Sequence, residues 1–227
     1  MDISSFKFQE PRSVPVILLL DTSGSMRSSG NIDVLNTAVF QMLDDFCAHD
    51  DSNVSINVAI YSFGPDVREI IPLMSVFDAK EKYQSMTANG GTPLGGVLRY
   101  VKSQLIEDKE KLPSRSYRPT VVLVSDGNPN DDWEPALFDF KENGRSAKCV
   151  RMALGIGYEI GDPSYKMLSQ FVSDNELLFT ASEASKIRSF FKFVTMSTIF
   201  RTASQNPNVQ PTPQALAAED DDDDDIF

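Results

Sequence analysis

Asp21, Ser23 and Ser25 are the residues whose types and spacing point most directly to chemistry. They stand in the run Asp-Thr-Ser-Gly-Ser, directly after the uncharged apolar stretch 15–20. An apolar run without alternation predicts a strand buried on both faces, and open α/β sheets bind ligands just beyond the carboxyl ends of such strands. One carboxylate and two hydroxyls, brought round one point by Gly24, suit a hard cation. The sequence therefore predicts a cation-binding loop at this strand end.

Two more segments carry residues of the same kind. A second apolar strand is predicted at 120–125, and like the first it ends on an aspartate, Asp126. The glycine-rich stretch 89–96 contains Thr92 and precedes a helical pattern that runs to residue 105, with Pro93 suited to the first helical position. We expect Thr92 to be available as a further oxygen ligand.

The elements that must position these residues alternate along the chain. Strands are predicted at 15–20, 53–63, 67–71, 120–125, 149–156 and 176–179, and helices at 32–46, 80–86, 94–105, 133–140, from 162, and at 184–200. The strand 67–71 follows a Gly-Pro-Asp turn, so we expect it to return antiparallel at an edge and to end at Pro72. The alternation predicts an α/β fold: a mainly parallel central sheet with one antiparallel edge strand and helices on both faces.

Length and composition favour one domain with a tail. The 227 residues are 41% hydrophobic, enough for one substantial core. We expect an N-terminal arm at 1–13, a folded domain at 14–200, and a disordered region at 201–227 that joins a Pro/Gln/Asn-containing linker to an acidic tail. The formal charge is −12, of which Glu219 to Asp225 supply seven. The body carries no evident basic patch, so we do not expect nucleic acid as a partner.

The remaining bulk features bear on location. Cys47 and Cys149 are the two cysteines, and we expect both to be buried free thiols in a reducing compartment. Residues 1–12 are polar, without a signal-peptide pattern, and no apolar run reaches the roughly 20 residues of a membrane span. A cytoplasmic protein that does not enter the membrane is expected. His49 is the single histidine, so a zinc site is disfavoured.

The run Asp21 to Ser25 resembles the DxSxS signature of von Willebrand factor A domains, which have a Rossmann-like three-layer sandwich with a metal-ion-dependent adhesion site. In that family a threonine from a separate loop and an aspartate after the fourth strand complete the site, and Thr92 and Asp126 stand in those places. The segments GGTPLGGVL (90–98) and SDGNPNDDW (125–133) resemble the bacterial TerY-type branch, associated with tellurite resistance and stress operons. The resemblance covers about 14–200.

The resemblance implies a complete site and a binding function without catalysis. Ser23, Ser25 and Thr92 would hold Mg²⁺, or Mn²⁺ or Ca²⁺, directly, while Asp21 and Asp126 would act through ordered waters. A partner's Asp or Glu carboxylate would complete the shell, and the Thr92 loop would move between weak-binding and tight-binding states. We expect the residues around these ligands to include Gly24, Gly91, Asn130 and Asp131. The TerY-type resemblance implies a kinase and a phosphatase encoded nearby as partners, in a metal-stress or defence pathway.

Three alternatives stay open from the residues themselves. An aspartate after the first strand is also where haloacid-dehalogenase-type phosphatases place their nucleophile beside Mg²⁺, but they need a second acid two residues on, where this chain has Ser23. A purely structural domain with a decayed site is disfavoured because all five ligands are present. The carboxylates Asp220 to Asp225 could occupy the metal site of their own or a neighbouring molecule, which would give self-association, and the closing Ile226-Phe227 could be a docking motif.

Overall fold

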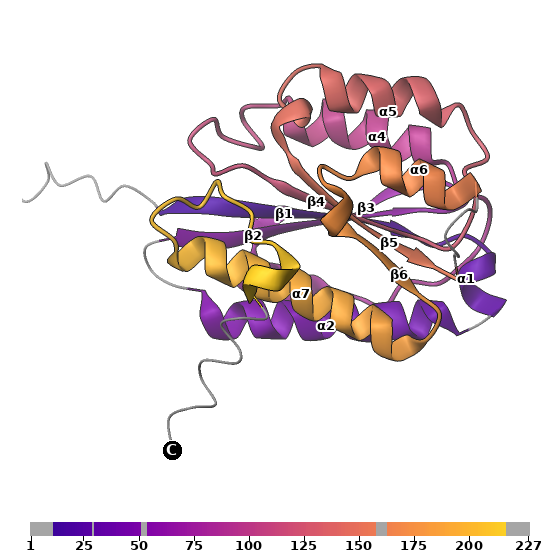
Figure 1. Cartoon of the computed structure of the whole chain (residues 1–227), viewed down its shortest axis with the longest axis horizontal. Helices are drawn as coiled ribbons and strands as arrows, with labels where there is room; N and C mark the ends of the chain where they lie inside the picture. The colour runs from indigo at the N-terminus through magenta and orange to yellow at the C-terminus, as the bar shows by residue number, and fades with distance from the viewer. Residues whose placement is uncertain (1–10, 29, 51–53, 158–162, 217–227) are drawn as a thin grey trace, which may run out of the picture.

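A six-stranded sheet with β1 near its centre forms the middle layer (Figure 1). The computed structural model describes residues 11–28, 30–50, 54–157 and 163–216. The strand order is β3-β2-β1-β4-β5-β6, and only the β2–β3 pair is antiparallel. The predicted fold class, a mainly parallel sheet with one antiparallel edge strand, is confirmed. The strands are β1 (Arg12–Asp21), β2 (Val54–Phe63), β3 (Val67–Ser75), β4 (Thr120–Ser125), β5 (Val150–Ile156) and β6 (Leu178–Ala181).

Helices cover both faces of the sheet (Figure 1). One face packs against α2 (Asn31–His49), α3 (Val76–Lys82) and α7 (Ala184–Ala203). The other packs against α4 (Leu94–Val101), α5 (Trp133–Glu142) and α6 (Pro163–Phe171). The short elements are α1 (Ser25–Ser28), the π-helical turn η2 (Lys102–Ile106) and the 3₁₀ turns η3 (Ser146–Lys148) and η4 (Asn175–Leu177). The helix beginning at 94 was expected to run to 105; α4 ends at Val101, and the η2 turn continues it to Ile106.

The apolar run of β1 is buried because it supplies both cores. Val16, Leu18 and Leu20 face the layer of α2 and α7, whereas Ile17 and Leu19 face the layer of α4 and α5, and all five are fully buried. A strand covered on both faces has no solvent side, which explains why its sequence lacks alternation. In the β1–β4 register Leu20 lies opposite Val124, so the strands end side by side at Asp21 and Ser125.

The sheet edge differs from the sequence expectation. The β3 strand continues past Pro72 to Ser75, and its pairing with β2 shifts register between Ile71 and Met74. Proline is tolerated there because the residue lies on an edge strand at an irregularity of the ladder. The helix expected at 80–86 is α3 at 76–82, which begins after Ser75, whose hydroxyl accepts the Asp78 N–H. Ser75 therefore caps the first turn of α3.

The segment after α7 is folded where disorder was expected. Within the region 201–227, the first residues complete α7 and the chain then packs back on the domain, with Pro207, Pro211 and Leu216 buried. Arg201 anchors this segment because its guanidinium, fully buried, donates to Thr120 Oγ1 (2.6 Å), Pro207 O (2.7 Å) and Arg118 O (2.5 Å). The acidic run and residues 226–227 lie outside the described residues, as do residues 1–10 of the expected N-terminal arm.

Two bulk expectations can be compared with the structure. Cys149 is buried as predicted, but Cys47 is only partly buried, because it packs against the margin of the core and not inside it. Across the residues with described positions, no helix combines the length and the apolar character that crossing a membrane requires.

Candidate metal centre

Asp21 closes β1 with its carboxylate buried and held at both oxygens. Its Oδ1 accepts the backbone N–H of Ser23 at 2.8 Å, and its Oδ2 accepts the hydroxyl of Ser125 at 2.6 Å. The first bond turns the chain sharply after the strand, as Asp side chains do in tight turns. The second bond comes from the end of the neighbouring strand β4. The carboxylate is therefore fixed in orientation by two separate parts of the chain.

The two serines of the loop reach the second aspartate. Ser23 Oγ and Ser25 Oγ lie 2.9 Å apart, and Ser25 Oγ donates to Asp126 Oδ1 at 2.7 Å. Ser23 Oγ lies 3.4 Å from the same carboxylate oxygen. Asp126 follows β4 and is half-buried, while Ser25 is exposed at the start of α1. The structure thus brings the predicted residues of two loops into one hydroxyl and carboxylate cluster that opens to solvent at Ser25.

Thr92 joins this cluster from the loop before α4. A Cβ atom placed on Gly127 would lie 3.4 Å from Thr92 Oγ1 and 3.7 Å from Ser25 Oγ. The two hydroxyls therefore approach the same backbone point just after Asp126, although Thr92 and Ser25 are far apart in the sequence. Thr92 is 6% exposed, and its hydroxyl makes no hydrogen bond within the described ranges of the chain. That hydroxyl is available to a ligand.

The loop after β4 holds the Thr92 loop in place. The Thr92 carbonyl accepts the N–H of Asn130 at 3.1 Å. The carboxylate of Asp131 accepts the N–H groups of Gly95 (3.0 Å) and Gly96 (2.8 Å), which are free at the start of α4. Asp131 thus caps α4 from a different loop. Both residues were expected beside the site, and the structure gives them a specific role in joining the two loops.

Gly24 and Gly91, which were expected beside the site, allow the loops of the site to approach each other closely, and so does Gly90. The N–H of Gly24 donates to Gly90 O at 3.0 Å, which links the Asp21 loop to the Thr92 loop. Gly90 has φ +78°, a conformation that favours glycine. A Cβ on Gly91 would lie 2.0 Å from the side-chain nitrogen of Asn130. A side chain at Gly90 would strain the backbone and clash with Pro65, and one at Gly91 would require the Asn130 side chain to move.

The electrostatics of the cluster favour a cation. Burial raises the pKa of Asp21 to about 6, against hydrogen bonds from Ser125 and Ser23 that lower it, and the nearby Asp126 raises it further. Burial also raises the pKa of Asp126. Neither carboxylate forms an ion pair with a Lys or Arg of the described ranges. A buried and a half-buried carboxylate without a cationic partner are costly, so a bound cation would relieve the cost.

The donor set indicates which kind of cation fits. It consists of oxygen atoms alone, from three hydroxyls and two carboxylates, and no group of three or more His, Cys, Asp or Glu residues that could hold a metal occurs among the residues with assigned structure. Hard cations such as Mg²⁺ prefer oxygen ligands and keep several waters. The residues present therefore fit a hard divalent cation and lack the nitrogen and sulfur ligands of typical structural zinc sites.

Ser125 is the residue of this centre that the sequence reasoning missed. It was assigned only to the second core strand, yet its hydroxyl is the sole side-chain donor from β4 to the Asp21 carboxylate. The available signal was a polar residue closing an otherwise apolar strand, directly before Asp126. Its side chain faces Asp21 because the two strand ends are neighbours, which only the strand order reveals.

The fold has known relatives. The model of the von Willebrand factor type A domain matches residues 16–193, and the chain belongs to this family. Among solved structures it is similar to proximal thread matrix protein 1 from the mussel byssus with a zinc-occupied MIDAS motif (TM-score 0.60, 19% identity, 82% of this chain and 46% of that one). It is also similar to the pilus adhesin SpaC from Lactobacillus rhamnosus GG in an open conformation (0.69, 16%, 86% and 31%).

A third similar structure is the von Willebrand factor type A protein from Catenulispora acidiphila (TM-score 0.62, 19% identity, 83% of this chain and 43% of that one). The chain spans about half or less of these three solved chains. At such identities the likeness establishes the fold. No curated protein matches the sequence.

Proposed function

We propose that Asp21, Ser23, Ser25, Thr92 and Asp126 bind Mg²⁺, and that the ion captures an Asp or Glu carboxylate of a protein partner. Domains of this family are known for metal-dependent protein–protein interaction. One observation carries the proposal. Three hydroxyls and two carboxylates without a Lys or Arg partner among the described residues come from three loops and meet in one cluster that opens to solvent. Mn²⁺ and Ca²⁺ are the other ions with suitable oxygen chemistry.

The ratio of hydroxyls to carboxylates explains how such an ion would bind a partner. When bound, the ion supplies an electrophilic position for an outside carboxylate. Ser23, Ser25 and Thr92 contribute no negative charge as ligands, and Asp21 and Asp126 are already engaged by hydroxyl and amide donors. The protein thus leaves the ion under-neutralised, which keeps it attractive to a carboxylate from another molecule.

The proposed role is that of a non-enzymatic adaptor. The competing reading, a Mg²⁺-dependent haloacid-dehalogenase-like phosphatase with Asp21 as nucleophile, is disfavoured. Both carboxylate oxygens of Asp21 accept hydrogen bonds, and residue 23 is a serine that cannot act as the general acid. The resemblance to TerY-type proteins extends the proposal to a tellurite, metal-stress or defence system with a kinase and a phosphatase as partners. A cytoplasmic location is part of the same proposal.

A peptide selection tests this function without knowledge of the partner. Immobilised protein in Mg²⁺ would select binders from a random-peptide library, and bound peptides would be eluted with EDTA. We expect the eluted peptides to share an Asp or Glu whose replacement by Asn or Gln abolishes binding. The matched control is Thr92→Val, which should retain few such peptides. Peptides that lack an essential carboxylate, or that remain bound in EDTA, would contradict the proposal.

A further inference from the structure

A second charged cavity lies at the opposite end of the sheet from the candidate metal centre. It has a volume of about 440 Å³ and lies where β4 and β5 begin, whereas Asp21 and Asp126 lie where strands end. Its walls come from the loop before β4, from the region of η3, and from Asn208 in the segment after α7. Asn208 is tied to this loop because its side-chain oxygen accepts the N–H of Arg118 at 2.8 Å.

All the charged residues that line this cavity are cationic. They are Lys109, Arg118, Arg145 and Lys148, and the lining contains no Asp or Glu. None of the four forms an ion pair with another residue whose position is described. The four cations are scattered between positions 109 and 148, so the sequence of this acidic chain indicated no basic patch. The fold gathers them, which corrects that expectation.

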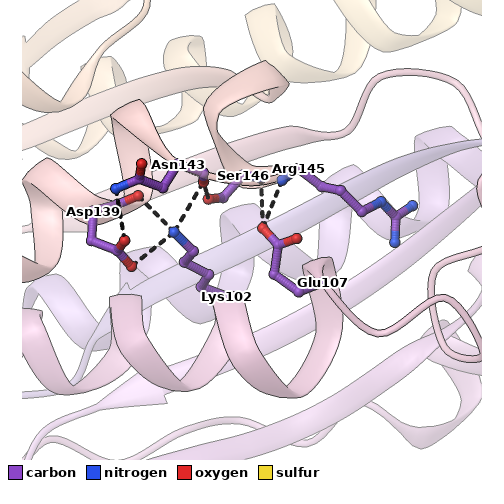
Figure 2. A network of polar contacts seen from close by, with 6 residues as sticks. All are labelled: Lys102, Glu107, Asp139, Asn143, Arg145 and Ser146. Carbon is purple, nitrogen blue, oxygen red and sulfur yellow. Dashed lines mark hydrogen bonds and ion pairs between the residues drawn. The ribbon is translucent and has the colours of Figure 1, made fainter.

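Arg145 shows most clearly that the cavity lacks an anion. Figure 2 shows the Glu107 carboxylate at the backbone of Arg145, where it accepts the N–H groups of Arg145 (2.7 Å) and Ser146 (3.1 Å), while the guanidinium points away. Nη2 of the guanidinium donates to Leu112 O at 2.8 Å. Nη1 is buried and has no hydrogen-bond partner among the described residues. A buried, unpaired donor on a charged group is costly, and an oxyanion bound to the Arg145 guanidinium would relieve that cost.

Arg201 adds a further cation at the same end of the fold. Its guanidinium contacts the backbone of Arg118, a lining residue of the cavity, and has no acidic partner in the part of the chain that is described. Burial, and then the positive charge of Arg118, lower the pKa of Arg201 to about 10. Arg118 and Arg201 therefore place two neighbouring cations, without acidic partners among the described residues, at this end of the sheet, in a chain whose formal charge is −12.

We propose that this cavity binds a carboxylate-rich segment, and that its occupant is the acidic run of this same chain, Glu219 to Asp225. Seven consecutive carboxylates match the uncompensated cations in sign and in chemistry, since guanidinium and carboxylate form strong hydrogen bonds.

The length of the chain permits this docking. Asn208, at the cavity, and Leu216 are eight residues apart, so they lie at most about 29 Å from each other. The nine residues from Leu216 to Asp225 span up to about 32 Å when extended, so even at the largest separation the end of the acidic run reaches the cavity. The inference is independent of the proposed metal function and competes with the alternative that these carboxylates occupy the metal centre.

A fluorescence-anisotropy titration with a labelled peptide of residues 217–227 tests the assignment. The peptide is added to two full-length proteins in low salt and EDTA, and the EDTA removes the metal centre as a receptor. The first protein is wild type. In the second, the acidic run is neutralised by Glu219→Gln and by changing Asp220 to Asp225 to Asn. We expect the neutralised chain to bind the peptide at least tenfold more tightly than wild type, whose own acidic run competes. Raising the salt concentration should weaken binding.

Cavity variants are made in the neutralised chain. Arg145→Gln with Lys148→Gln should weaken peptide binding at least tenfold, and the surface pair Lys109→Gln with Lys148→Gln should do so severalfold without touching a buried group. The matched control, Lys166→Gln with Arg188→Gln, removes the same charge elsewhere and should bind as before. Thermal unfolding confirms that each variant is folded.

Three outcomes would overturn the assignment. The first is equal peptide affinity in wild type, neutralised chain and cavity variants. The second is binding that appears only with Mg²⁺ and is lost in Asp21→Asn, which would place the acidic run at the metal centre. The third is that the protein binds inorganic phosphate but does not bind the peptide, which would make the cavity a site for free oxyanions.

Discussion

The hydroxyl of Ser125 donates to Oδ2 of Asp21 at 2.6 Å, across the ends of two neighbouring strands. This bond fixes the orientation of the carboxylate that closes β1. It does not involve the hydroxyls of Ser23 and Ser25, which remain available to the proposed ion. Outer partners of this kind orient a metal ligand and tune its charge. We therefore expect Ser125 to contribute to the affinity of the proposed metal site, although it is not one of the five proposed ligands.

Ser125→Ala should weaken Mg²⁺ binding by roughly tenfold, since loss of an outer-shell partner costs about 10-fold to 100-fold. The free energy of unfolding should fall by about 1.5–3 kcal/mol, the worth of one hydrogen bond to a charged group. Calorimetric titration and chemical denaturation measure the two quantities. Ser169→Ala, an exposed serine on α6, is the control. An unchanged Mg²⁺ affinity in Ser125→Ala would exclude this role.

The buried Asp21 makes the stability of the metal-free protein depend on pH. Its pKa is raised from 3.8 to about 6, so between these values the folded state binds the proton more tightly than the unfolded state. The carboxylate therefore costs stability above about pH 6, and the cost is relieved as the pH falls. From pH 7.5 to 5, wild type should gain roughly 1 kcal/mol relative to Asp21→Asn in EDTA. Parallel denaturation profiles of the two proteins would contradict this prediction.

Asp131 is predicted to support the Thr92 loop through α4. Asp131→Ala removes the acceptor for the N–H groups of Gly95 and Gly96, which should lower the unfolding free energy by about 1 kcal/mol, as for a lost helix cap. It should also weaken Mg²⁺ binding severalfold because Thr92 directly precedes this turn. Asp132→Ala is the matched control, since the Asp132 side chain makes no capping bond to α5. Equal effects of the two variants would show that only charge matters.

Arg201 is predicted to hold the segment 204–216 on the domain. Arg201→Met leaves the acceptors Thr120 Oγ1, Pro207 O and Arg118 O without their donor, which should cost about 3 kcal/mol of stability. Limited proteolysis should then cut within 204–216 at least tenfold faster. Arg188→Met, an exposed arginine on the same helix, should change neither quantity appreciably. Unchanged cleavage in Arg201→Met would show that the apolar residues of the segment suffice to hold it.

Much of the fold could be predicted from the sequence because buried parallel strands have uninterrupted apolar sequences. The stretches 15–20 and 120–125 are β1 and β4 within a few residues; β1 ends on Asp21, and β4 ends directly before Asp126. The edge was harder to predict. The course of β3 past Pro72 depends on a ladder irregularity with β2, and the segment 204–216 is held by Arg201, whose partners are distant in the sequence.

The site was predictable where a motif is local and not where contacts join separate strands. The loop Asp21 to Ser25 is contiguous, and Thr92 and Asp126 followed from the family resemblance. Ser125 and the capping role of Asp131 arise only when β1 lies beside β4 and the two loops meet. The cationic cavity was missed for the same reason, since Lys109 and Lys148 become neighbours only through folding.

Calorimetric titration of MgCl₂ into chelator-treated protein tests the central claim most directly. Wild type should bind one Mg²⁺, whereas Asp21→Asn and Thr92→Val should each bind at least tenfold more weakly, because each loses an oxygen ligand or its charge. Thr37→Val, on the exposed face of α2, should bind as wild type does. If wild type binds no divalent ion, or if Thr92→Val binds with unchanged affinity, the five residues do not form the proposed metal site.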